Sequence, residues 1–598
     1  MRSLARLNFY YWKYKHLFIP GLLCAVASSA FAIIVPMVVR QAVDSIPRFV
    51  TAYKAFQGTP VENGLYGEFF MSLASFGAMI ILLSIGSGIF SFLMRQTVVV
   101  ASRHIEYDLR NQLYEKLQLL SQDFYMQYPT GDIITRSTSD IEQVRRYIGP
   151  AIMYTTRAVV TIAVAVTVMF VISPKLTWYT LIPMPLLAFS VFIVADMVHS
   201  RSDILQKQYS VLTSKVQEAV SGIRVLKAYV REDAEAEAFD AESAEYRVKS
   251  LDLAWIEAAW RPVFLTLVGM STIIVVWIGG SLAIAGEISI GNIAEYIIYV
   301  SMMTWPVASM GFVITMVQRA AASMTRLNDI FDATPSILTT DKELASPIKG
   351  EITFDAVRFT HENNDKPALE NVSFTVPAGT TFAIVGRTGA GKTTLVELIP
   401  RLLDVESGRL LIDGINIKDI PVGELRRAIG YVPQDVFLFS ETLAENISFG
   451  QLGAPVEKIE QAALEADILA NIESFEKGFE TFVGERGITL SGGQKQRTSI
   501  ARALIREPKI LILDDALSAV DVETERTILG HLKSHFGKRT IGIVSHRISA
   551  VQDADLIIVL DDGKVIEQGN HASLLEEGGF YASLFTKQQL EKELEDIE

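Results

Sequence analysis

The most informative stretch in the second half of this chain is Gly386-Arg387-Thr388-Gly389-Ala390-Gly391-Lys392-Thr393-Thr394. It follows an apolar run, Thr381 to Val385, and leads into a helical pattern, Leu395 to Leu403. In the spacing G-x-x-x-x-G-K-[ST] between a strand and a helix, the glycines let backbone N–H groups turn toward phosphate oxygens. Lys392 supplies a positive charge for the β- and γ-phosphates, and the Thr393 hydroxyl can coordinate Mg²⁺. The sequence therefore predicts a site for a nucleoside triphosphate.

The composition excludes some classes of function. Hydrophobic residues make up 49% of the 598 residues, and the mean hydropathy is +0.29, which is high for a chain that also contains a nucleotide domain. The formal net charge of −14 argues against a nucleic-acid partner, because such surfaces are basic. The single cysteine, Cys24, excludes an internal disulfide.

Six segments of the first half contain no Lys, Arg, Asp or Glu over lengths that can cross a bilayer, which takes about 20 residues. The third and fourth, and the fifth and sixth, follow one another closely and predict two tight hairpins. The sequence therefore predicts a membrane-embedded helical domain. The six segments are Leu17–Val39, Phe69–Met94, Ala158–Pro174, Leu176–Ala195, Pro262–Gly286 and Tyr296–Gln318.

The basic residues give the orientation of these helices. They gather before the first segment and in the two long loops after the second and fourth, which should therefore face the cytoplasm. Both loops are rich in helix formers and are interrupted at Pro129-Thr130-Gly131 and Ser221-Gly222. Such a break is suited to docking on another domain, although a solvated turn is nearly as good an interpretation. Residues 1–16, aromatic and basic, predict a helix lying in the membrane interface.

The second half has the pattern of an α/β domain with a β-rich start. Strand-like alternation appears in Glu351–Phe359 and Asn371–Val376, and Asp413-Gly414 marks a hairpin turn. Another apolar strand, Lys509 to Leu513, ends in the carboxylates of Asp514 and Asp515. We expect an interfacial helix at 1–16, a transmembrane domain at 17–327, a linker at 328–349, the nucleotide-binding domain at 350–585 and an acidic tail at 586–598.

Between the glycine loop and this strand lies Leu490-Ser491-Gly492-Gly493-Gln494. With this segment the chain resembles an ATP-binding-cassette (ABC) exporter half-transporter over essentially its whole length. The resemblance implies six transmembrane helices fused to an α/β P-loop NTPase domain. It also implies ATP hydrolysis coupled to transport, in a multi-pass protein of a bacterial inner or plasma membrane whose nucleotide domain is cytoplasmic.

The resemblance also assigns roles to individual residues. Thr393, Gln434 and Asp514 resemble the Mg²⁺ ligands, Asp515 occupies the position of the general base, and His546 resembles the switch histidine that bonds the γ-phosphate. The segment from Ser491 to Gln494 would close over ATP held by the opposite subunit. The implied ATP contacts are His361, Gly386, Arg387, Thr388, Gly389, Ala390, Gly391, Lys392, Thr393, Thr394, Gln434, Ser491, Gly492, Gly493 and Gln494.

Two positions depart from the family pattern. His361 stands where an aromatic residue usually stacks on adenine, and an imidazole offers less surface. Asp515 stands where the general base is usually Glu, and its carboxylate should fall about 1.5 Å short, the length of one C–C bond. General bases contribute about 10²–10⁴-fold and need hydrogen-bond reach, so we expect slow hydrolysis at this site. The alternative is that Asp515 reaches through a small backbone adjustment or a second water.

The mixture of Asp515 with an intact Leu-Ser-Gly-Gly-Gln resembles one member of a heterodimeric exporter, although a homodimer stays open. We expect a partner half-transporter with Glu after its strand-end Asp and an altered signature segment. The expected function is ATP-driven export of a small lipophilic drug or lipid by alternating access. The alternatives are a lipid flippase and an ATP-gated channel or regulator. A lipophilic substrate fits the side chains of the last segment, although lipid-facing packing explains each of them equally: Met302, Met303, Trp305, Phe312 and Met316.

Overall fold

The computed structural model describes residues 2–340, 342, 344–361, 364–533 and 538–595. The chain divides into two compact units. The first contains Met1–Gln118 and Thr130–Asp332, and the second contains Leu119–Pro129 and Ala333–Glu598.

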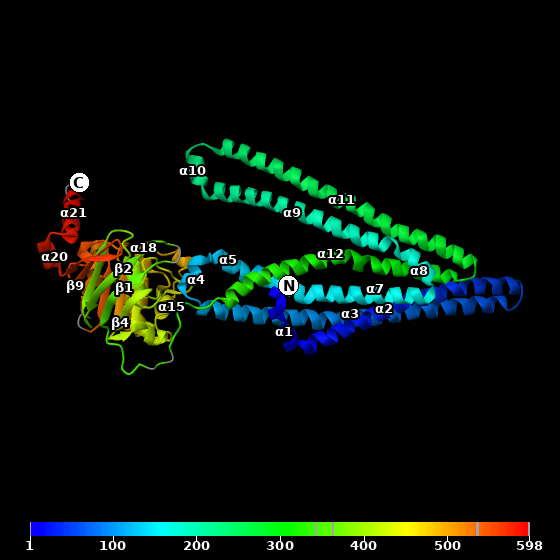
Figure 1. Cartoon of the computed structure of the whole chain (residues 1–598), viewed down its shortest axis with the longest axis horizontal. Coiled ribbons are helices and arrows are strands. Elements are labelled where there is room, and N and C mark those ends of the chain that lie inside the picture. The colour runs from blue at the N-terminus through cyan, green and yellow to red at the C-terminus, as the bar shows by residue number, and fades with distance from the viewer. Residues whose placement is uncertain (1, 341, 343, 362–363, 534–537, 596–598) are drawn as a thin grey trace. The chain divides into compact units, whose positions relative to one another are not determined.

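The first unit consists of long helices (Figure 1). Within the described residues, six helical stretches are long and apolar enough to cross a membrane, which confirms the six predicted spans. The third stretch ends with α7 (Ile152–Ile172), and the fourth joins α8 (Pro174–Leu181) to α9 (Pro183–Ser221). The other four are α2 (Lys15–Phe56), α3 (Glu62–Leu119), α11 (Glu232–Ile284) and α12 (Ile290–Asp332).

Shorter elements complete this unit. A 3-10 turn (Arg2–Arg6) and α1 (Leu7–Lys13) open the chain. Leu7 and Tyr10 are buried, whereas Phe9 and Trp12 are 65% and 70% exposed, which is the two-faced pattern of an interfacial helix. The remaining short elements are α5 (Thr130–Thr135), α6 (Ile141–Arg146), α10 (Ile223–Ala228) and two π-helical turns at Arg136–Asp140 and Tyr147–Ala151.

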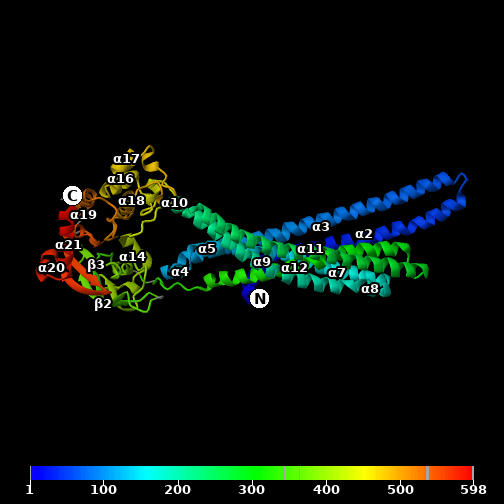
Figure 2. The same cartoon turned by 90° about the horizontal axis from the view of Figure 1, so that it is seen from above.

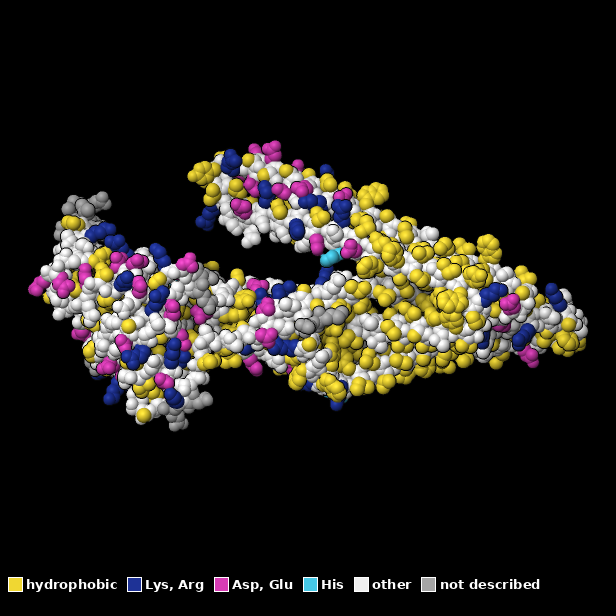
Figure 3. All heavy atoms as spheres, in the orientation of Figure 1, with side chains coloured by type: hydrophobic (Ala, Val, Ile, Leu, Met, Phe, Trp, Pro, Cys, Tyr) yellow, Lys and Arg dark blue, Asp and Glu magenta, His cyan; other side chains and the backbone are white. Residues whose placement is uncertain are grey.

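Helix α12 packs against α2 and α7, and α9 packs along α11 (Figures 1 and 2). Two buried tyrosines join α12 to α7 and α2. The Tyr296 hydroxyl donates to the Met169 carbonyl at 2.6 Å, and the Tyr299 hydroxyl donates to the Ile33 carbonyl at 3.2 Å. Many outward-facing side chains of these helices are apolar, and Figure 3 shows them as a broad hydrophobic zone with charged side chains toward both ends. A surface of this kind is stable only against lipid.

The second unit contains two sheets. Strands β2 (Leu369–Val376), β1 (Ile352–Phe359), β4 (Ser407–Ile412) and β5 (Ile415–Asn416) form an antiparallel sheet in that order. The other sheet has the order β10-β9-β3-β8-β7-β6, parallel except for β10. Its strands are β3 (Thr381–Gly386), β6 (Ile429–Val432), β7 (Ile510–Asp514), β8 (Thr540–Val544), β9 (Leu556–Asp561) and β10 (Lys564–Gly569).

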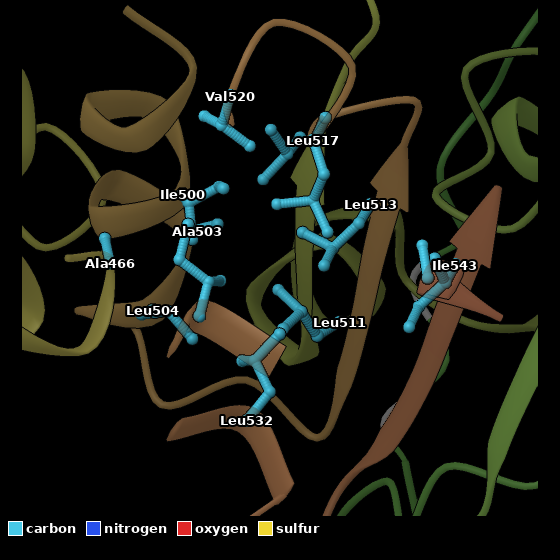
Figure 4. Packing of buried hydrophobic residues seen from close by; sticks show 14 of the residues in the cluster. Ala466, Ile500, Ala503, Leu504, Leu511, Leu513, Leu517, Val520, Leu532 and Ile543 are labelled. Carbon is cyan, nitrogen blue, oxygen red and sulfur yellow. The ribbon is translucent and has the colours of Figure 1, made fainter. Parts of the chain in front are cut away.

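Helices cover the parallel sheet and connect its strands. In Figure 4, Ile500, Ala503 and Leu504 of α18 pack against Leu511 and Leu513 of β7. A second apolar cluster fills the space between the two sheets. The helices are α13 (Lys392–Leu398), α14 (Val422–Ala428), α15 (Leu443–Ser448), α16 (Val456–Glu465), α17 (Leu469–Ser474), α18 (Gly492–Leu504), α19 (Val522–Lys533), α20 (His571–Glu577) and α21 (Phe580–Glu595).

Several boundaries differ from the sequence patterns. The helix after the glycine loop ends at Leu398 rather than Leu403, because Pro400 follows and Arg401 adopts a left-handed φ of +53°. Helix α3 ends at Leu119, and a separate short helix, α4 (Gln122–Gln127), belongs to the second unit. Helix α21 runs through residue 585, where the sequence suggested the start of a tail.

Candidate functional site

The glycine loop leaves the end of β3 and turns into α13, as the sequence predicts. Gly389 and Gly391 have φ of +84° and +94°, in the left-handed region that glycine adopts without strain. A Cβ on Gly391 would also lie 2.4 Å from the Ala368 carbonyl oxygen. The loop can therefore bring its backbone N–H groups to the surface only with glycine at this position.

The Lys392 side chain is buried beneath this loop. Its Nζ donates to the carbonyl oxygens of Gly386 at 2.9 Å and Arg387 at 2.8 Å. Burial lowers the pKa of Lys392, while Asp515 and Asp514 raise it. The ammonium group is thus held at the loop, where an anionic ligand would stabilise its charge.

A cavity of about 400 Å³ lies beside the loop. Its wall contains eleven of the residues that the sequence assigned to the nucleotide site, drawn from five separate parts of the second unit. They are His361, Thr388, Gly389, Gly391, Lys392, Thr393, Thr394, Gln434, Asp514, Asp515 and His546. Gly386, Arg387 and Ala390 belong to the same loop but do not line the cavity wall.

Asp514 ends β7 and is 1% exposed. Within the described residues its Oδ2 has no hydrogen-bond partner, although the Thr393 side chain bonds the carboxyl group. Burial raises the pKa of Asp514 to about 6, and Glu397 and Asp515 add to this rise, whereas Thr393 and Lys392 oppose it. A buried, unsatisfied carboxylate oxygen is costly, so this group is poised for a cation.

Asp515 follows directly and adopts a left-handed φ of +47°. Its N–H donates to the Val544 carbonyl at 2.9 Å, and its own carbonyl accepts from the Ser518 hydroxyl at 2.8 Å. Burial raises the pKa of Asp515, and the charges of His546, Lys392 and Arg547 lower it. Asp tolerates the left-handed region better than most residues, so its backbone suits this turn.

His546 faces Asp515 and Lys392 across the cavity. Burial lowers the pKa of His546, Lys392 lowers it further, and Asp515 raises it. The imidazole is therefore neutral near pH 7 and can donate one hydrogen bond to an anionic group.

His361 and Gln434 complete the cavity at its other edges. The His361 Nε2 lies 3.2 Å from the Thr394 hydroxyl, and its ring meets Phe359 edge to face. The structure thus places His361 beside the glycine loop, and its contact with adenine stays a prediction.

Comparisons with known proteins match this fold. Residues 17–307 match the family described as ABC transporter transmembrane region, and residues 369–518 match the family described as ABC transporter. The chain is 37% identical to the probable multidrug resistance ABC transporter ATP-binding/permease protein YheI of Bacillus subtilis, over 81% of this chain and 83% of that protein. It is 32% identical to the multidrug resistance-like ATP-binding protein MdlA of Escherichia coli, over 100% and 98% of the two chains.

The chain belongs to the ABC transporter family. A bacterial Atm1-family ABC exporter solved with ATP bound has the same fold, with a TM-score of 0.76 and 25% identity over 96% of this chain and 99% of that one. This ABC transporter is therefore an ATP-hydrolysing protein of the bacterial plasma membrane. It crosses the membrane several times, holds its ATP-binding domain in the cytoplasm and acts as a dimer, since ABC exporter half-transporters dimerise.

The signature segment of this ABC transporter lies apart from the cavity. Ser491 caps α18: its hydroxyl accepts from the Gln494 N–H at 3.3 Å, and the Gln494 side chain accepts from the Ser491 N–H at 2.9 Å. Within the described residues, none of Ser491, Gly492, Gly493 and Gln494 lines the cavity. The capping box instead presents the N-terminus of α18 at an exposed surface, which favours anionic groups.

The sequence patterns missed several residues of the cavity wall. Lys366 and Asp562 come from turns that carry no motif, and Val544 is an ordinary strand residue. The polar run Glu362 to Lys366 was the available signal, although residues 362 and 363 lie outside the described part. The other wall residues that were missed are Asn364, Pro367 and Ala368.

Helix α4 contacts the nucleotide domain within the second unit. Gln122 Nε2 donates to Glu397 Oε1 at 3.4 Å, and the Ser336 hydroxyl donates to Asp123 at 3.0 Å. Ser121 accepts from the Ile337 N–H at 3.1 Å. The contacts of the second unit are thus made at residues 121–123, whereas docking at the predicted break, 129–131, stays a prediction.

Proposed function

We propose that this ABC transporter exports a lipophilic substrate that carries a polar head, by alternating access. The observation that carries the proposal is a cavity of about 380 Å³ within the membrane unit, between α9, α11 and α12. Its apolar wall includes Val191, Trp260 and Phe312, and its polar residues include Glu257 and Arg319.

The polar part of this cavity lies at one level of the helices. Arg319 follows directly after the last apolar span, and Glu257 precedes the fifth span by a few residues. Both positions correspond to the cytoplasmic boundary of the membrane. Neither Glu257 nor Arg319 forms an ion pair with another described residue. An amphiphile would place its apolar body against Trp260 and Phe312 and its head between the two charges.

ATP would drive the transport cycle through the residues of the nucleotide cavity. Lys392 and the loop N–H groups bind the phosphates, His546 donates to the γ-phosphate, and Asp515 accepts a proton from the attacking water. The signature segment of a second subunit closes the site, so ATP binding draws two nucleotide domains together. Helix α4, bonded to Glu397 of α13, transmits that movement toward the membrane helices.

The residues around Asp514 fit Mg²⁺. The spare oxygen of Asp514, the Thr393 hydroxyl and the Gln434 amide oxygen are oxygen ligands of the type that Mg²⁺ prefers, and they leave positions for phosphate oxygens. When bound, Mg²⁺ neutralises charge on the β- and γ-phosphates.

We infer further that the partner is a different half-transporter and that the site of this chain hydrolyses ATP slowly. Asp515 supports this, because its side chain is one methylene shorter than Glu. The test is co-expression of two differently tagged copies of this chain with the second half-transporter. A heterodimer predicts that the two tagged copies do not purify together, whereas a homodimer predicts that they do.

The function itself is tested in inside-out vesicles that contain the transporter, with a fluorescent amphiphile supplied outside. Uphill accumulation that depends on ATP and disappears in Lys392→Ala supports export. Movement only down a gradient would instead indicate an ATP-gated channel. Exchange of a labelled phospholipid between leaflets, without accumulation of the soluble amphiphile, would indicate a flippase.

A further inference from the structure

The loop that carries His546 is held from one side by the C-terminal helix. Gln588 of α21 bonds two backbone groups of the loop with one amide: its Nε2 donates to the His546 carbonyl at 2.6 Å, and its Oε1 accepts from the Ile548 N–H at 2.9 Å. The two backbone partners fix the orientation of this amide, because the opposite orientation would bring like groups together.

The other side of the loop is held by Arg547. Its guanidinium donates to the carbonyls of Ser518 and Val520, each at 3.1 Å, and to Glu525 at 2.9 Å. The backbone around His546 therefore lies between two sets of hydrogen bonds, one from α19 and the segment before it, and one from α21.

Helix α21 is itself firmly attached. The Glu567 carboxylate accepts from the N–H groups of Phe580 and Tyr581, at the helix N-terminus. The Tyr581 side chain is fully buried, and its hydroxyl lies 2.8 Å from His571 Nδ1. The guanidinium of Arg387 lies over the Phe580 ring, with its Cζ 5.3 Å from the centroid of the ring. The same helix thus touches the glycine loop at one end and the His546 loop farther along.

We propose that Gln588 is a positioning residue for His546. Helix α21 holds the glycine loop and the His546 loop in a fixed arrangement around the terminal phosphate of ATP. A single amide that bonds residues 546 and 548 leaves the backbone between them little freedom. That constraint keeps the imidazole directed into the cavity that Lys392 and Asp515 share. Without Gln588, the loop would keep its bonds through Arg547 but lose the bond to the carbonyl of His546 itself.

The test uses the full-length transporter in nanodiscs and compares Gln588→Ala with Gln589→Ala, an exposed neighbour on the same helix. The readouts are the dissociation constants for ATP and ADP, which differ by the γ-phosphate alone, measured by displacement of a fluorescent nucleotide. Gln588→Ala should weaken ATP binding by about five-fold, the equivalent of one hydrogen bond, and leave ADP binding unchanged. Gln589→Ala should change neither constant.

A second variant and a second measurement separate positioning from general loss of structure. Gln588→Glu keeps an acceptor for the Ile548 N–H but cannot donate to the His546 carbonyl. It should therefore preserve slow hydrogen exchange at Ile548 and still weaken ATP binding, whereas Gln588→Ala should speed exchange at Ile548. Equal weakening of ATP and ADP in both variants would overturn the proposal, as would unchanged ATP binding despite faster exchange. Because neither readout involves transport, the result is independent of the proposed substrate.

Discussion

Asp514 and Asp515 are adjacent carboxylates that differ in burial and in backbone conformation. Asp514 ends β7 almost fully buried, with one oxygen that bonds no described residue. Asp515 turns the chain with a left-handed φ of +47° and faces His546 and Lys392. The strand end therefore separates two tasks: the first carboxylate suits a cation and the second suits proton transfer.

Asp515→Glu should speed ATP hydrolysis by about 10-fold or more, because the added methylene brings the carboxylate nearer to the attacking water. The left-handed backbone opposes the change at a cost of about 1 kcal/mol, since Glu tolerates this region less well than Asp. Steady-state phosphate release by the purified transporter measures the effect. Asp515→Asn is the control and should remove only the part of the activity that comes from the site of this chain. If Asp515→Glu were slower than the natural protein, Asp515 would already reach the water and the proposal of a slow site would be wrong.

The apparent affinity for Mg²⁺ should depend on pH through Asp514. Its pKa is raised to about 6, so the carboxyl is ionised at pH 7.5 and protonated at pH 5, where a proton competes with the cation. Mg²⁺ affinity should therefore be constant above about pH 7 and fall about ten-fold per unit below pH 6. Titration with Mg²⁺ in the presence of a fluorescent ATP analogue measures it.

Phosphate groups of the nucleotide also titrate in this range, so the comparison is with Asp514→Asn. This variant should bind Mg²⁺ more weakly at pH 7.5 and lose the part of the pH dependence that belongs to the protein. If Mg²⁺ affinity varied with pH in the same way in the natural protein and in Asp514→Asn, the pH dependence would belong to the nucleotide alone.

The two charged residues of the membrane cavity, Glu257 and Arg319, should each favour substrates of the opposite charge. Glu257→Gln should raise the KM for a cationic amphiphile by about 5–10-fold, because it removes a charge-assisted contact, and should spare a neutral one. Arg319→Gln should do the same for an anionic amphiphile. Transport rates in inside-out vesicles provide the measurement.

Glu287→Gln is the matched control, because Glu287 lies in the short hairpin between the last two spans and away from this cavity. Two results would count against the cavity as the site of the substrate head. One is an equal change in KM in Glu257→Gln and Glu287→Gln, and the other is an equal loss of transport for cationic, neutral and anionic amphiphiles.

The bond between Gln122 and Glu397 should couple substrate binding to hydrolysis. Burial raises the pKa of Glu397, and its bond to Gln122 lowers it, so Gln122→Ala removes a partner from a half-buried carboxyl group. We expect the stimulation of ATP hydrolysis by substrate to fall about two- to five-fold, with basal hydrolysis unchanged. Met126→Ala, on the exposed side of α4, should leave the stimulation intact. A proportional drop in basal and stimulated rates would show damage to the nucleotide site instead.

The class of fold and most residues of the candidate nucleotide cavity could be predicted from the sequence. Six uncharged segments can be stable only across a bilayer, and the glycine loop needs its strand and helix, so both patterns are local and strong. The segment after Gly391 also predicted a helix, but its end was misplaced, because Pro400 and the left-handed Arg401 terminate it earlier.

Contacts between residues far apart in the sequence became visible only in the folded chain. Val544 and Asp562 join the cavity because strand order brings the ends of β8 and β9 to one edge of the parallel sheet, and Lys366 comes from the connection between β1 and β2 of the other sheet. No local pattern encodes that arrangement. The same holds for Gln588, which lies 42 residues from His546 in a segment whose composition suggested a tail. Hydrogen bonds between remote backbone and side-chain groups depend on packing, and packing is not visible in the periodicity of a sequence.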